Sequence, residues 1–444
     1  MNESIAPRTD DLFDGMPTTQ SFVDRLVRLD PASQRIDIGS DVLPPVLRPQ
    51  ATLGVMDITE WFGDTSGGIR TYLLQKAQYV AMRPWLRHVL TVPGERDAIT
   101  EDDGVRMYRL QGPPIPRQKP YRFMLATRSV AKIVRHERPD IIEIGSPFIV
   151  PWVVRHATRD LDVPLICFYH SNLPRMFAPH AGRNGTARRF VYRASWRYMR
   201  RLDRLFPLTI VTSDFSANDL AREGITRIAK VPLGVDLDCF NPRRTAYAAD
   251  TRRRFALPPG PLAGFVGRFA SEKELDMVLD AWAVVERRTG ARLALVGAGP
   301  LEAMLRAHAY GPRVTFVPFQ TSRDALADLL AAFDVYIAPG SIETFGLSSL
   351  EALASGTPVL SADQGGVAEQ VKASGAGRTF VSSVAASLAE EAIALFASDL
   401  SSLGRLGRLF AETEHSWDTV FERLFAVYRD VLGRDVIGRD VIER

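Results

Sequence analysis

Two glutamates, Glu343 and Glu351, lie eight residues apart in the stretch of the sequence with the clearest chemical potential. If both belonged to one helix, their side chains would be separated by about 12 Å along its axis. We therefore place Glu343 in a loop and Glu351 in the first turns of the helix that follows, so that both face one crevice. Carboxylates in a crevice suit the hydroxyl groups of a sugar. The alternative is a pair that only caps the helix, which describes Glu351 better than Glu343 because Glu343 precedes the helix.

Three backbone N–H groups lie between these glutamates at the start of the predicted helix, those of Phe345, Gly346 and Leu347. The first N–H groups of a helix have no partner within it, and the helix dipole favours negative charge at that end. Helix starts of this kind bind phosphate. The sequence therefore predicts a phosphate-binding turn beside the carboxylates.

Two cations, Arg268 and Lys273, stand five residues apart after a predicted strand, in GFVGRFASEK at residues 264–273. At this spacing both can close on one anion. Fixed cations in a cleft without water stabilise the charge that develops on a departing diphosphate, and they need no metal ion to do so. The alternative is surface pairing with Glu272 or Glu274, which accounts for either cation alone better than for both.

Two weaker signals come from the first half of the chain. Gly67 and Gly68 lie between a predicted strand and a predicted helix, where a glycine pair lets the backbone approach a ligand, although a tight turn explains the pair equally well. His170 follows a buried strand and would face the same cleft, although a single histidine is more often structural than catalytic. No residue of the sequence stands out as a covalent nucleophile.

The elements that must position these residues alternate between strand and helix. Buried-strand patterns occur at residues 53–58, 141–144, 165–169 and 208–211, and after the breaker at 258–261 they recur at 262–266, 293–296, 314–317, 335–338 and 359–362. Helical spacing fills the intervals, for example in the helix that carries Ile69, Leu73, Ala77 and Val80. Such alternation is typical of a parallel sheet covered on both faces. We predict an α/β chain with two Rossmann-like doubly wound parallel-sheet domains that face a central cleft.

Composition narrows the classes of protein. The chain has 444 residues, of which 46% are hydrophobic and 24% charged, and this excludes disordered and fibrous proteins. A net charge of +3 is too close to balance to indicate a nucleic-acid partner. No apolar run reaches the roughly 18 residues of a membrane span, and the acidic first twenty residues do not form a signal peptide, so we expect a cytoplasmic protein. The two cysteines, Cys167 and Cys239, lack the spacing of metal ligands and suit buried free thiols.

The glutamate pair, the two cations and the glycine loop together resemble the retaining nucleotide-sugar glycosyltransferases of glycosyltransferase family 4, which have the GT-B fold and the pattern E-x7-E. The resemblance extends from about residue 52 to 432. It implies transfer of a hexose (glucose, mannose or galactose) from a UDP- or GDP-sugar to a hydroxyl of a lipid or glycan acceptor, with neither a metal ion nor another cofactor. The alternatives are a soluble small-molecule or polysaccharide acceptor, and a non-catalytic protein that binds sugar nucleotides.

The same resemblance implies roles for individual residues. Glu343 would contact the donor sugar and Glu351 the ribose of the nucleotide. Contacts to the diphosphate are implied for Arg268, Lys273, Gly67 and Gly68, and a place near the donor sugar is implied for His170. Leu233 stands where the family more often has asparagine, so we assign it no polar contact. Asp236 and Asp238 could suggest a metal site, but we interpret these alternating acids as a turn and predict no required metal.

We divide the chain into four parts. Residues 1–50 are an N-terminal arm, 51–240 the acceptor-side Rossmann-like domain and 241–412 the nucleotide-sugar-binding Rossmann-like domain. Residues 413–444 are a C-terminal helix, around 417–431, that returns to the first domain as in related enzymes, followed by a tail.

A strongly basic segment needs its own explanation. Residues 183–206 hold eight arginines against a single acid, interleaved with aromatic residues. Such a helix can attract anionic lipid while its aromatics enter the headgroup region, or it can be a solvated helix whose aromatics pack on their own domain. Because the resembling enzymes often act on membrane lipids, we expect peripheral contact with the inner face of the cell membrane rather than RNA binding. The residues assigned to this anionic surface are Arg183, Arg188, Arg189, Arg193, Trp196, Arg197, Arg200 and Arg201.

Overall fold

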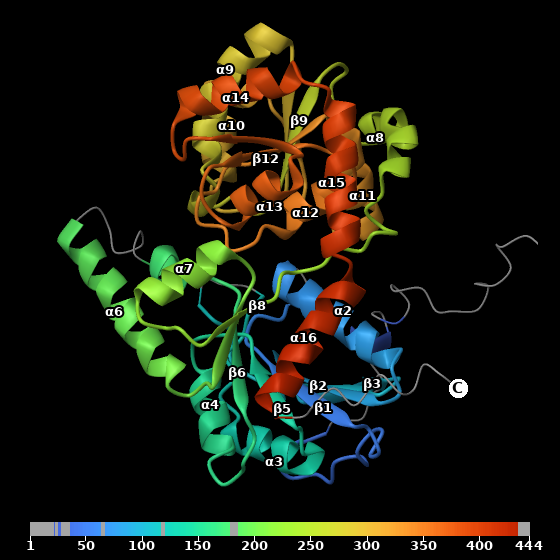
Figure 1. The fold of residues 1–444 in the computed structure, drawn as a ribbon, viewed down its shortest axis with the longest axis vertical. Coiled ribbons are helices and arrows are strands. Elements are labelled where there is room, and N and C mark those ends of the chain that lie inside the picture. Colours follow the sequence, from blue (N-terminus) through green and yellow to red (C-terminus); the bar gives the residue numbers. More distant parts are fainter. Residues whose placement is uncertain are drawn as a thin grey trace, which may run out of the picture.

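The computed structural model describes residues 22, 25–27, 36–63, 67–116, 120–177 and 185–433. Figure 1 shows two stacked lobes, each built around one sheet. The N-terminal lobe contains an eight-stranded sheet in the order β3-β4-β2-β1-β5-β6-β7-β8, and the C-terminal lobe a six-stranded sheet in the order β11-β10-β9-β12-β13-β14. Helices cover both sheets, so the predicted α/β class with two doubly wound sheets is confirmed.

The N-terminal lobe contains the strands that the hydrophobic runs predict, together with four that they do not. Predicted and observed bounds agree for β1 (Leu53–Ile58), β5 (Ile141–Ile144), β6 (Leu165–Tyr169) and β7 (Leu208–Val211). The additional strands are β2 (Leu86–Gly94), β3 (Ala98–Asp102), β4 (Val105–Gln111) and β8 (Ile228–Lys230). The helices of this lobe are α2 (Gly68–Ala81), α3 (Thr127–Glu137), α4 (Val150–Ala157), α5 (Leu173–Phe177), α6 (Gly185–Asp203) and α7 (Asp214–Arg222).

One edge of this sheet departs from the predicted parallel arrangement. Strands β3 and β4 pair antiparallel as a hairpin. Its two turn residues, Asp103 and Gly104, both have positive φ, at 42° and 79°. A two-residue loop with both residues in this region matches the twist of the flanking strands, which is why Asp-Gly is a common hairpin sequence.

The C-terminal lobe follows the predicted alternation closely. Its strands are β9 (Leu262–Val266), β10 (Arg292–Val296), β11 (Thr315–Val317), β12 (Val335–Ala338), β13 (Val359–Ala362) and β14 (Gly377–Phe380), all parallel. Its helices are α8 (Ala248–Arg254), α9 (Leu275–Thr289), α10 (Glu302–Ala307), α11 (Arg323–Ala332), α12 (Leu347–Ala354), α13 (Gly366–Ser374), α14 (Ala385–Phe396) and α15 (Leu400–Glu414). Parallel strands direct their carboxyl ends to one edge, so the loops after β9 and β12 meet at the cleft between the lobes.

The chain crosses between the lobes twice, and the two crossings run side by side. On the way out, the Val235 N–H donates to His415 O at 2.8 Å, and on the way back His415 Nδ1 lies 2.9 Å from Leu233 O. Gly234 is needed there because a Cβ atom would lie 2.7 Å from the ring of Trp417. The returning helix, α16 (Trp417–Val431), then packs on α2 of the N-terminal lobe (Figure 1).

Helix α16 is bound to the N-terminal lobe by both apolar and polar contacts. Its buried side chains recur every three or four residues, as one face of a helix requires: Trp417, Val420, Phe421, Leu424, Phe425 and Tyr428. Tyr428 also reaches a charged cluster beneath β1 and β5, where it accepts a hydrogen bond from Lys76 Nζ at 2.8 Å and donates one to Glu143.

The cluster is almost fully buried. Lys76 pairs with Asp57 at 2.8 Å and with Glu143 at 3.2 Å, and the three side chains are at most 3% exposed. Burial would raise the pKa of Asp57, but the charge of Lys76 and a hydrogen bond from His88 outweigh it and hold that pKa well below its usual range. For Glu143 the effect of burial is larger than that of the Lys76 charge, so the pKa of Glu143 rises to about 8. The charge of Lys76 is therefore balanced by the Asp57 carboxylate.

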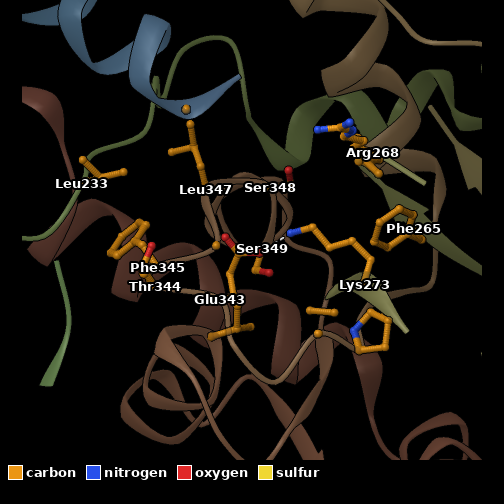
Figure 2. Close-up of a pocket in the computed structure, with 18 of the residues that line it drawn as sticks. Leu233, Phe265, Arg268, Lys273, Glu343, Thr344, Phe345, Leu347, Ser348 and Ser349 are labelled. Carbon is orange, nitrogen blue, oxygen red and sulfur yellow. Dashed lines mark hydrogen bonds and ion pairs between the residues drawn. The ribbon is translucent and has the colours of Figure 1, made fainter. Parts of the chain in front are cut away.

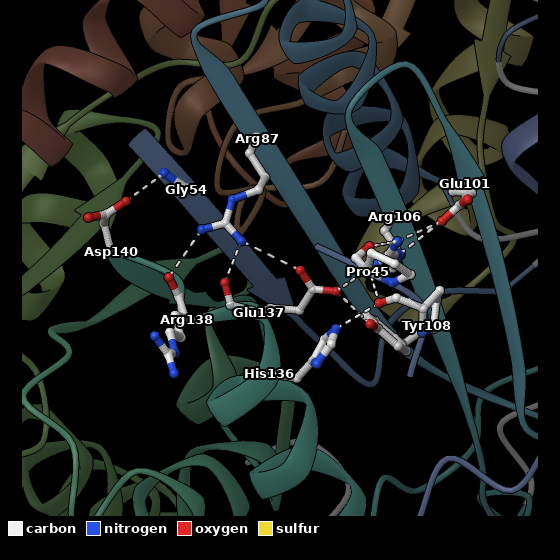
Figure 3. A network of polar contacts seen from close by, with 11 residues as sticks. Pro45, Gly54, Arg87, Glu101, Arg106, Tyr108, His136, Glu137, Arg138 and Asp140 are labelled. Atoms are coloured by element: carbon white, nitrogen blue, oxygen red, sulfur yellow. Dashed lines mark hydrogen bonds and ion pairs between the residues drawn. The ribbon is translucent and has the colours of Figure 1, made fainter. Parts of the chain in front are cut away.

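A second polar network fastens residues 36–50 to the far end of the N-terminal lobe (Figure 3). Arg106 pairs with Glu137 at 2.7 Å and donates to Pro45 O at 2.7 Å, while His136 Nε2 lies 2.7 Å from Pro44 O. Glu137 also accepts from Tyr108. Part of the predicted N-terminal arm therefore packs on the body of the lobe.

Candidate active site

A pocket of about 330 Å³ lies between the lobes. Its walls come from strand ends and from the loops and helix starts that follow them: Gly68 and His170 from the N-terminal lobe, Arg268 and Lys273 after β9, and residues 338–340 and 343–349 from the end of β12 to the start of α12. Eight of the ten residues predicted as a site line it, namely Gly68, His170, Arg268, Lys273, Glu343, Phe345, Gly346 and Leu347. Gly67 and Glu351 are outside its lining.

The turn from Glu343 to Leu347, here called the 343–347 turn, lies at the pocket wall and has bonded carbonyls but unpaired N–H groups. Gly366 N donates to Glu343 O at 2.8 Å, Thr212 Oγ1 to Thr344 O at 3.1 Å and Gln370 Nε2 to Phe345 O at 2.8 Å. No described residue accepts a hydrogen bond from the N–H of residues 345, 346 or 347. The turn therefore offers unpaired donors at the start of α12, where an anion is favoured.

Gly346 is the residue that makes this turn possible. Its φ is 87°, and a Cβ atom would lie 2.2 Å from the Val367 side chain. Both facts exclude a side chain at this position, since the left-handed region disfavours one and the neighbouring helix leaves no room. The close approach of α13 therefore fixes the shape of the turn.

Lys273 and Glu343 form an ion pair inside the pocket, and Figure 2 shows the two side chains directed at each other. The side chains are 24% and 30% exposed. Burial opposes the charge of Lys273, but the Glu343 carboxylate outweighs it and raises the pKa of Lys273 above its ordinary value. The pairing partner predicted as an alternative, Glu274, instead accepts from Ser341 and Ser383.

Arg268 lines the pocket as an exposed cation. None of the described residues forms a hydrogen bond or ion pair with its guanidinium group. The charge of Arg268 does act on Tyr121 of the N-terminal lobe, where it opposes the rise that burial gives the Tyr121 pKa. Arg268 is therefore available to a ligand between the lobes.

The glycine loop of the N-terminal lobe faces the 343–347 turn across the pocket. A Cβ atom on Gly68, the first residue of α2, would lie 3.8 Å from the Leu347 side chain, the first residue of α12. Two helix starts thus point at the same space. Gly67 caps α2, and a Cβ atom there would have nothing within 4 Å.

His170 lines the pocket as a neutral ring. It stacks on Phe168 with ring centroids 4.1 Å apart, and its Nε2 atom is buried with no partner among the described residues. Burial, with a smaller contribution from the charge of Lys76, lowers the pKa of His170 to about 3. Such a ring can exchange hydrogen bonds with a hydroxyl group but carries no charge at neutral pH.

Glu351 is not part of the lining of this pocket, so a crevice shared by Glu343 and Glu351 stays a prediction. Glu351 is the fifth residue of α12, about one turn inside the helix, and it is 5% exposed. Its carboxylate senses Arg323 and Asp236, and burial raises its pKa to about 7 against the charge of Arg323. The side chain is therefore almost fully buried and outside the pocket lining, and its predicted contact with a ribose stays a prediction.

The Asp236-Leu237-Asp238 segment forms the turn that its spacing suggests. Asp236 Oδ1 accepts from Cys239 N at 3.0 Å, and Asp236 O accepts from Phe240 N at 2.9 Å. Across the part of the chain that the structure describes, no three acids, histidines or cysteines come close enough to hold a metal ion together. That no metal is required stays a prediction.

The basic helix α6 divides its residues differently from the prediction. Trp196, assigned to a membrane surface, is 2% exposed and packs in the core of the N-terminal lobe with Met199 and Leu202. A helix must bury one face to stay attached to its lobe, and Trp196 lies on that face. The arginines at 188, 189, 193, 197, 200 and 201 are exposed, as is Phe190, whereas Arg183 lies outside the described residues. None of the described helices is long and apolar enough to span a membrane.

Several pocket residues escaped the sequence analysis. Tyr336 lines the wall and donates to Val266 O at 3.1 Å, and Thr344 joins the two lobes. Other lining residues that were not predicted include Ile69, Ser171, Pro339, Gly340 and Val367. The available signal was position, because most of them lie just after a strand, at the edge where such sheets bind ligands.

Two doubly wound lobes that face each other across a pocket define the GT-B class of glycosyltransferase folds, and solved structures agree. Sucrose-phosphate synthase from Thermosynechococcus elongatus superposes with a TM-score of 0.70 at 23% identity, covering 86% of this chain and 99% of that one. HepE from Anabaena, in complex with UDP and glucose, superposes with a TM-score of 0.65 at 18% identity, over 84% and 98% of the two chains.

Sequence comparisons place the chain within this class. Models described as "Glycosyltransferase Family 4" and "Glycosyl transferases group 1" match residues 66–239 and 260–398. The GDP-mannose-dependent alpha-(1-6)-phosphatidylinositol dimannoside mannosyltransferase of Mycobacterium tuberculosis is 34% identical over 311 residues, 69% of this chain and 78% of that protein. The chain belongs to glycosyltransferase family 4 and is a glycosyltransferase.

Proposed function

We propose that this protein transfers a hexose from a nucleoside diphosphate sugar to a hydroxyl of a membrane lipid, with retention of configuration and without a metal ion. The observation that carries the proposal is the 343–347 turn, whose unpaired N–H groups belong to residues that line the same pocket as Arg268 and Lys273. A turn of unpaired donors beside two cations matches a diphosphate.

In the proposed reaction the bond between the sugar C1 and the diphosphate oxygen breaks, and the acceptor hydroxyl forms a bond to C1 from the same face. Negative charge grows on the departing phosphate, where Arg268, Lys273 and the N–H groups stabilise it. The acceptor proton passes to the departing phosphate. Glu343 would hold hydroxyls of the hexose, and His170, being neutral, would exchange a hydrogen bond with another.

The relatives favour one donor and one acceptor class. The Mycobacterium tuberculosis relative is named for GDP-mannose and for a phosphatidylinositol dimannoside acceptor. We propose GDP-mannose as the donor and an inositol phospholipid or its glycoside as the acceptor. Glucose and galactose, and UDP as the nucleotide, are the competing donors to test.

Helix α6 supplies a surface by which the protein would reach such a lipid. Figure 1 shows α6 along the outer edge of the N-terminal lobe. Phe190 is 72% exposed, and the arginines at 188, 189, 193 and 197 are exposed without an acidic partner among the described residues. We propose that these side chains contact anionic headgroups, with Phe190 entering the headgroup boundary.

The transfer proposal is tested with purified full chain and vesicles that contain phosphatidylinositol or its mannosides, in the presence of EDTA. We expect radiolabelled GDP-mannose to give a labelled lipid, and proton NMR of the product to show the α configuration. UDP-glucose, UDP-galactose and GDP-glucose serve as competing donors. Labelling from none of them, or labelling that EDTA abolishes, would overturn the corresponding part of the proposal.

The membrane proposal is tested by vesicle flotation. We expect Arg188→Glu with Arg193→Glu to lose at least about tenfold in partitioning to anionic vesicles, since each basic residue contributes about 1 kcal/mol near such a surface. The matched control reverses Arg287 and Arg288, two exposed arginines at the end of α9 in the other lobe. Equal partitioning of the two double variants would refute a role for α6.

A further inference from the structure

Thr344, in the middle of the 343–347 turn, joins the two lobes by its hydroxyl and its carbonyl. Its Oγ1 donates to His170 O at 2.8 Å, and its backbone O accepts from Thr212 Oγ1 at 3.1 Å. The residue is 8% exposed and Thr212 is 4% exposed. Both partners belong to the N-terminal lobe, at the ends of β6 and β7, whereas the turn belongs to the C-terminal lobe.

The neighbours of Thr344 are held differently. The carbonyls of Glu343 and Phe345 accept from Gly366 and Gln370, both in α13 of the same lobe. Within the described part of the turn, Thr344 thus makes the hydrogen bonds that leave the lobe. Glu343, on one side of Thr344, carries the carboxylate that pairs with Lys273. Phe345, on the other side, carries one of the unpaired N–H groups.

A third contact connects the same region to the N-terminal lobe. Glu369, also in α13, accepts from Asp214 N at 2.9 Å and from Phe215 N, at the start of α7. A carboxylate at a helix start is favourable because it meets unpaired N–H groups and the positive end of the dipole. The start of α13 therefore holds the 343–347 turn on one side and a helix of the other lobe on the other.

These contacts depend on the separation of the lobes in a way that contacts within one lobe do not. When the lobes part, water replaces the Thr344 partners, and such an exchange has a small net free energy. When the lobes meet without the Thr344 hydroxyl, the His170 carbonyl loses the donor it has here. A buried acceptor without a donor costs far more than an exchanged one. The hydroxyl thus favours the closed arrangement specifically.

We propose that Thr344 is a positioning residue that couples closure of the lobes to the geometry of the diphosphate site. It acts through Glu343 and the N–H groups of the 343–347 turn, and it holds them opposite His170. The chemistry of the donor rests on the proposed function, but the coupling between lobes and turn does not.

The first experiment compares kinetic constants of three variants. Thr344→Val keeps the shape and removes the hydroxyl donor, and we expect kcat to fall by about 5- to 50-fold, the cost of leaving the partly buried His170 carbonyl unpaired. Thr344→Ser restores the hydroxyl and should return kcat to within about threefold of wild type. The matched control is Thr357→Val, because Thr357 is 2% exposed and donates to Leu330 O at 2.7 Å within the C-terminal lobe.

The control separates positioning from folding. Thr357→Val should lower the thermal midpoint and leave kcat of the folded protein unchanged. Thr344→Val should lower kcat by much more than it lowers the affinity for GDP or UDP alone, since the cations that hold the diphosphate remain. The proposal is refuted if Thr344→Val and Thr357→Val have the same kcat, or if serine does not rescue.

The second experiment needs no substrate. Hydrogen exchange of the full chain follows the N–H groups of Asp214 and Phe215, which the interlobe contact with Glu369 protects here. We expect at least about fivefold faster exchange at these positions in Thr344→Val and wild-type exchange in Thr357→Val. Wild-type exchange in Thr344→Val would refute the coupling. If the wild-type protein transferred no sugar to any acceptor, the proposed function would fail while this comparison would still decide the role of Thr344.

Discussion

Two ion pairs, one in each lobe, use the same residue types for different purposes. In the C-terminal lobe Lys273 and Glu343 face the pocket and are 24% and 30% exposed. In the N-terminal lobe Lys76 and its partners Asp57 and Glu143 are at most 3% exposed, and Tyr428 closes the cluster. A ligand can take Glu343 or Lys273 from its partner because both border the pocket. The buried charges have no such access, so they hold α16, β1 and β5 together.

The exposed pair is therefore suited to contacts with a ligand, and the buried cluster is suited to holding the fold together. Water screens a partly exposed pair, so the pair contributes little to folding and can be exchanged for contacts to a ligand. A buried pair is expensive to break, because removal of one partner leaves the other charged and unpaired. Sequence position does not reveal this difference, since Lys76 lies 19 residues from Asp57 and Lys273 lies 70 residues from Glu343.

The largest predicted effect is on folding. Lys76→Met should lower the free energy of unfolding by about 3–5 kcal/mol, because Asp57 then stays buried without a counter-charge. Urea unfolding followed by circular dichroism measures it. Lys273→Met is the matched control and should cost at most about 1 kcal/mol. Equal losses in the two variants would contradict the distinction between the pairs.

The next effect is on turnover. Glu343→Gln should lower kcat by about 100-fold or more, since an amide can neither balance Lys273 nor hold sugar hydroxyls with a full charge, and removal of one such group typically has this effect. Initial rates at saturating donor measure it, while a thermal midpoint near that of wild type shows that the fold is intact. Glu272→Gln, outside the pocket lining, is the control. Wild-type kcat in Glu343→Gln would remove Glu343 from the site.

The smallest effect is the pH dependence of stability between about pH 7 and pH 9. The pKa of Glu143 is raised to about 8 in the folded protein, so between its unfolded value near 4.5 and about 8 the folded state holds more protons than the unfolded state. Its contribution to stability is present below that window and is lost as pH rises, at up to about 1.4 kcal/mol per pH unit.

The measurement uses the difference between wild type and Glu143→Gln, which removes the titrating group. Urea midpoints between pH 7 and 9 are the cleanest, because burial also lowers the pKa of His88 and this opposes the trend near and below pH 6.5. We expect the difference between the two proteins to shrink as pH rises and to level off above pH 8. A constant difference would show that Glu143 does not titrate in this window.

Much of the fold follows from hydrophobic runs, and the exceptions have a physical cause. Strands such as β1 and β6 read as apolar runs because they are buried on both faces. Strand β2 does not, because it contains His88 and Arg87, whose partners Asp57 and Glu137 lie far away in the sequence. From the sequence alone, a charged residue that is buried with a distant partner cannot be distinguished from a charged residue on the surface.

The candidate site divides in the same way. Residue types and local spacing indicate Glu343, Lys273 and the N–H groups after Glu343, all within two short segments. The pairing of Lys273 with Glu343 and the contacts of Thr344 join segments 70 to 174 residues apart, so they require the tertiary structure. The prediction that Trp196 lies on the membrane surface is wrong, because a helical pattern does not say which aromatic side chain faces the core.

The return of α16 to the N-terminal lobe sets an order for biosynthesis. The hydroxyl of Tyr428 completes the buried charged cluster, whose other members all lie before residue 144. A ribosome making this chain from the N-terminus releases α16 after the whole C-terminal lobe, so the first lobe to emerge is the last to be finished. A fragment that stops before α16 should consequently expose the apolar surface of α2 and associate or be degraded. The C-terminal lobe does not depend on α16 in this way, because α16 packs on α2 of the other lobe.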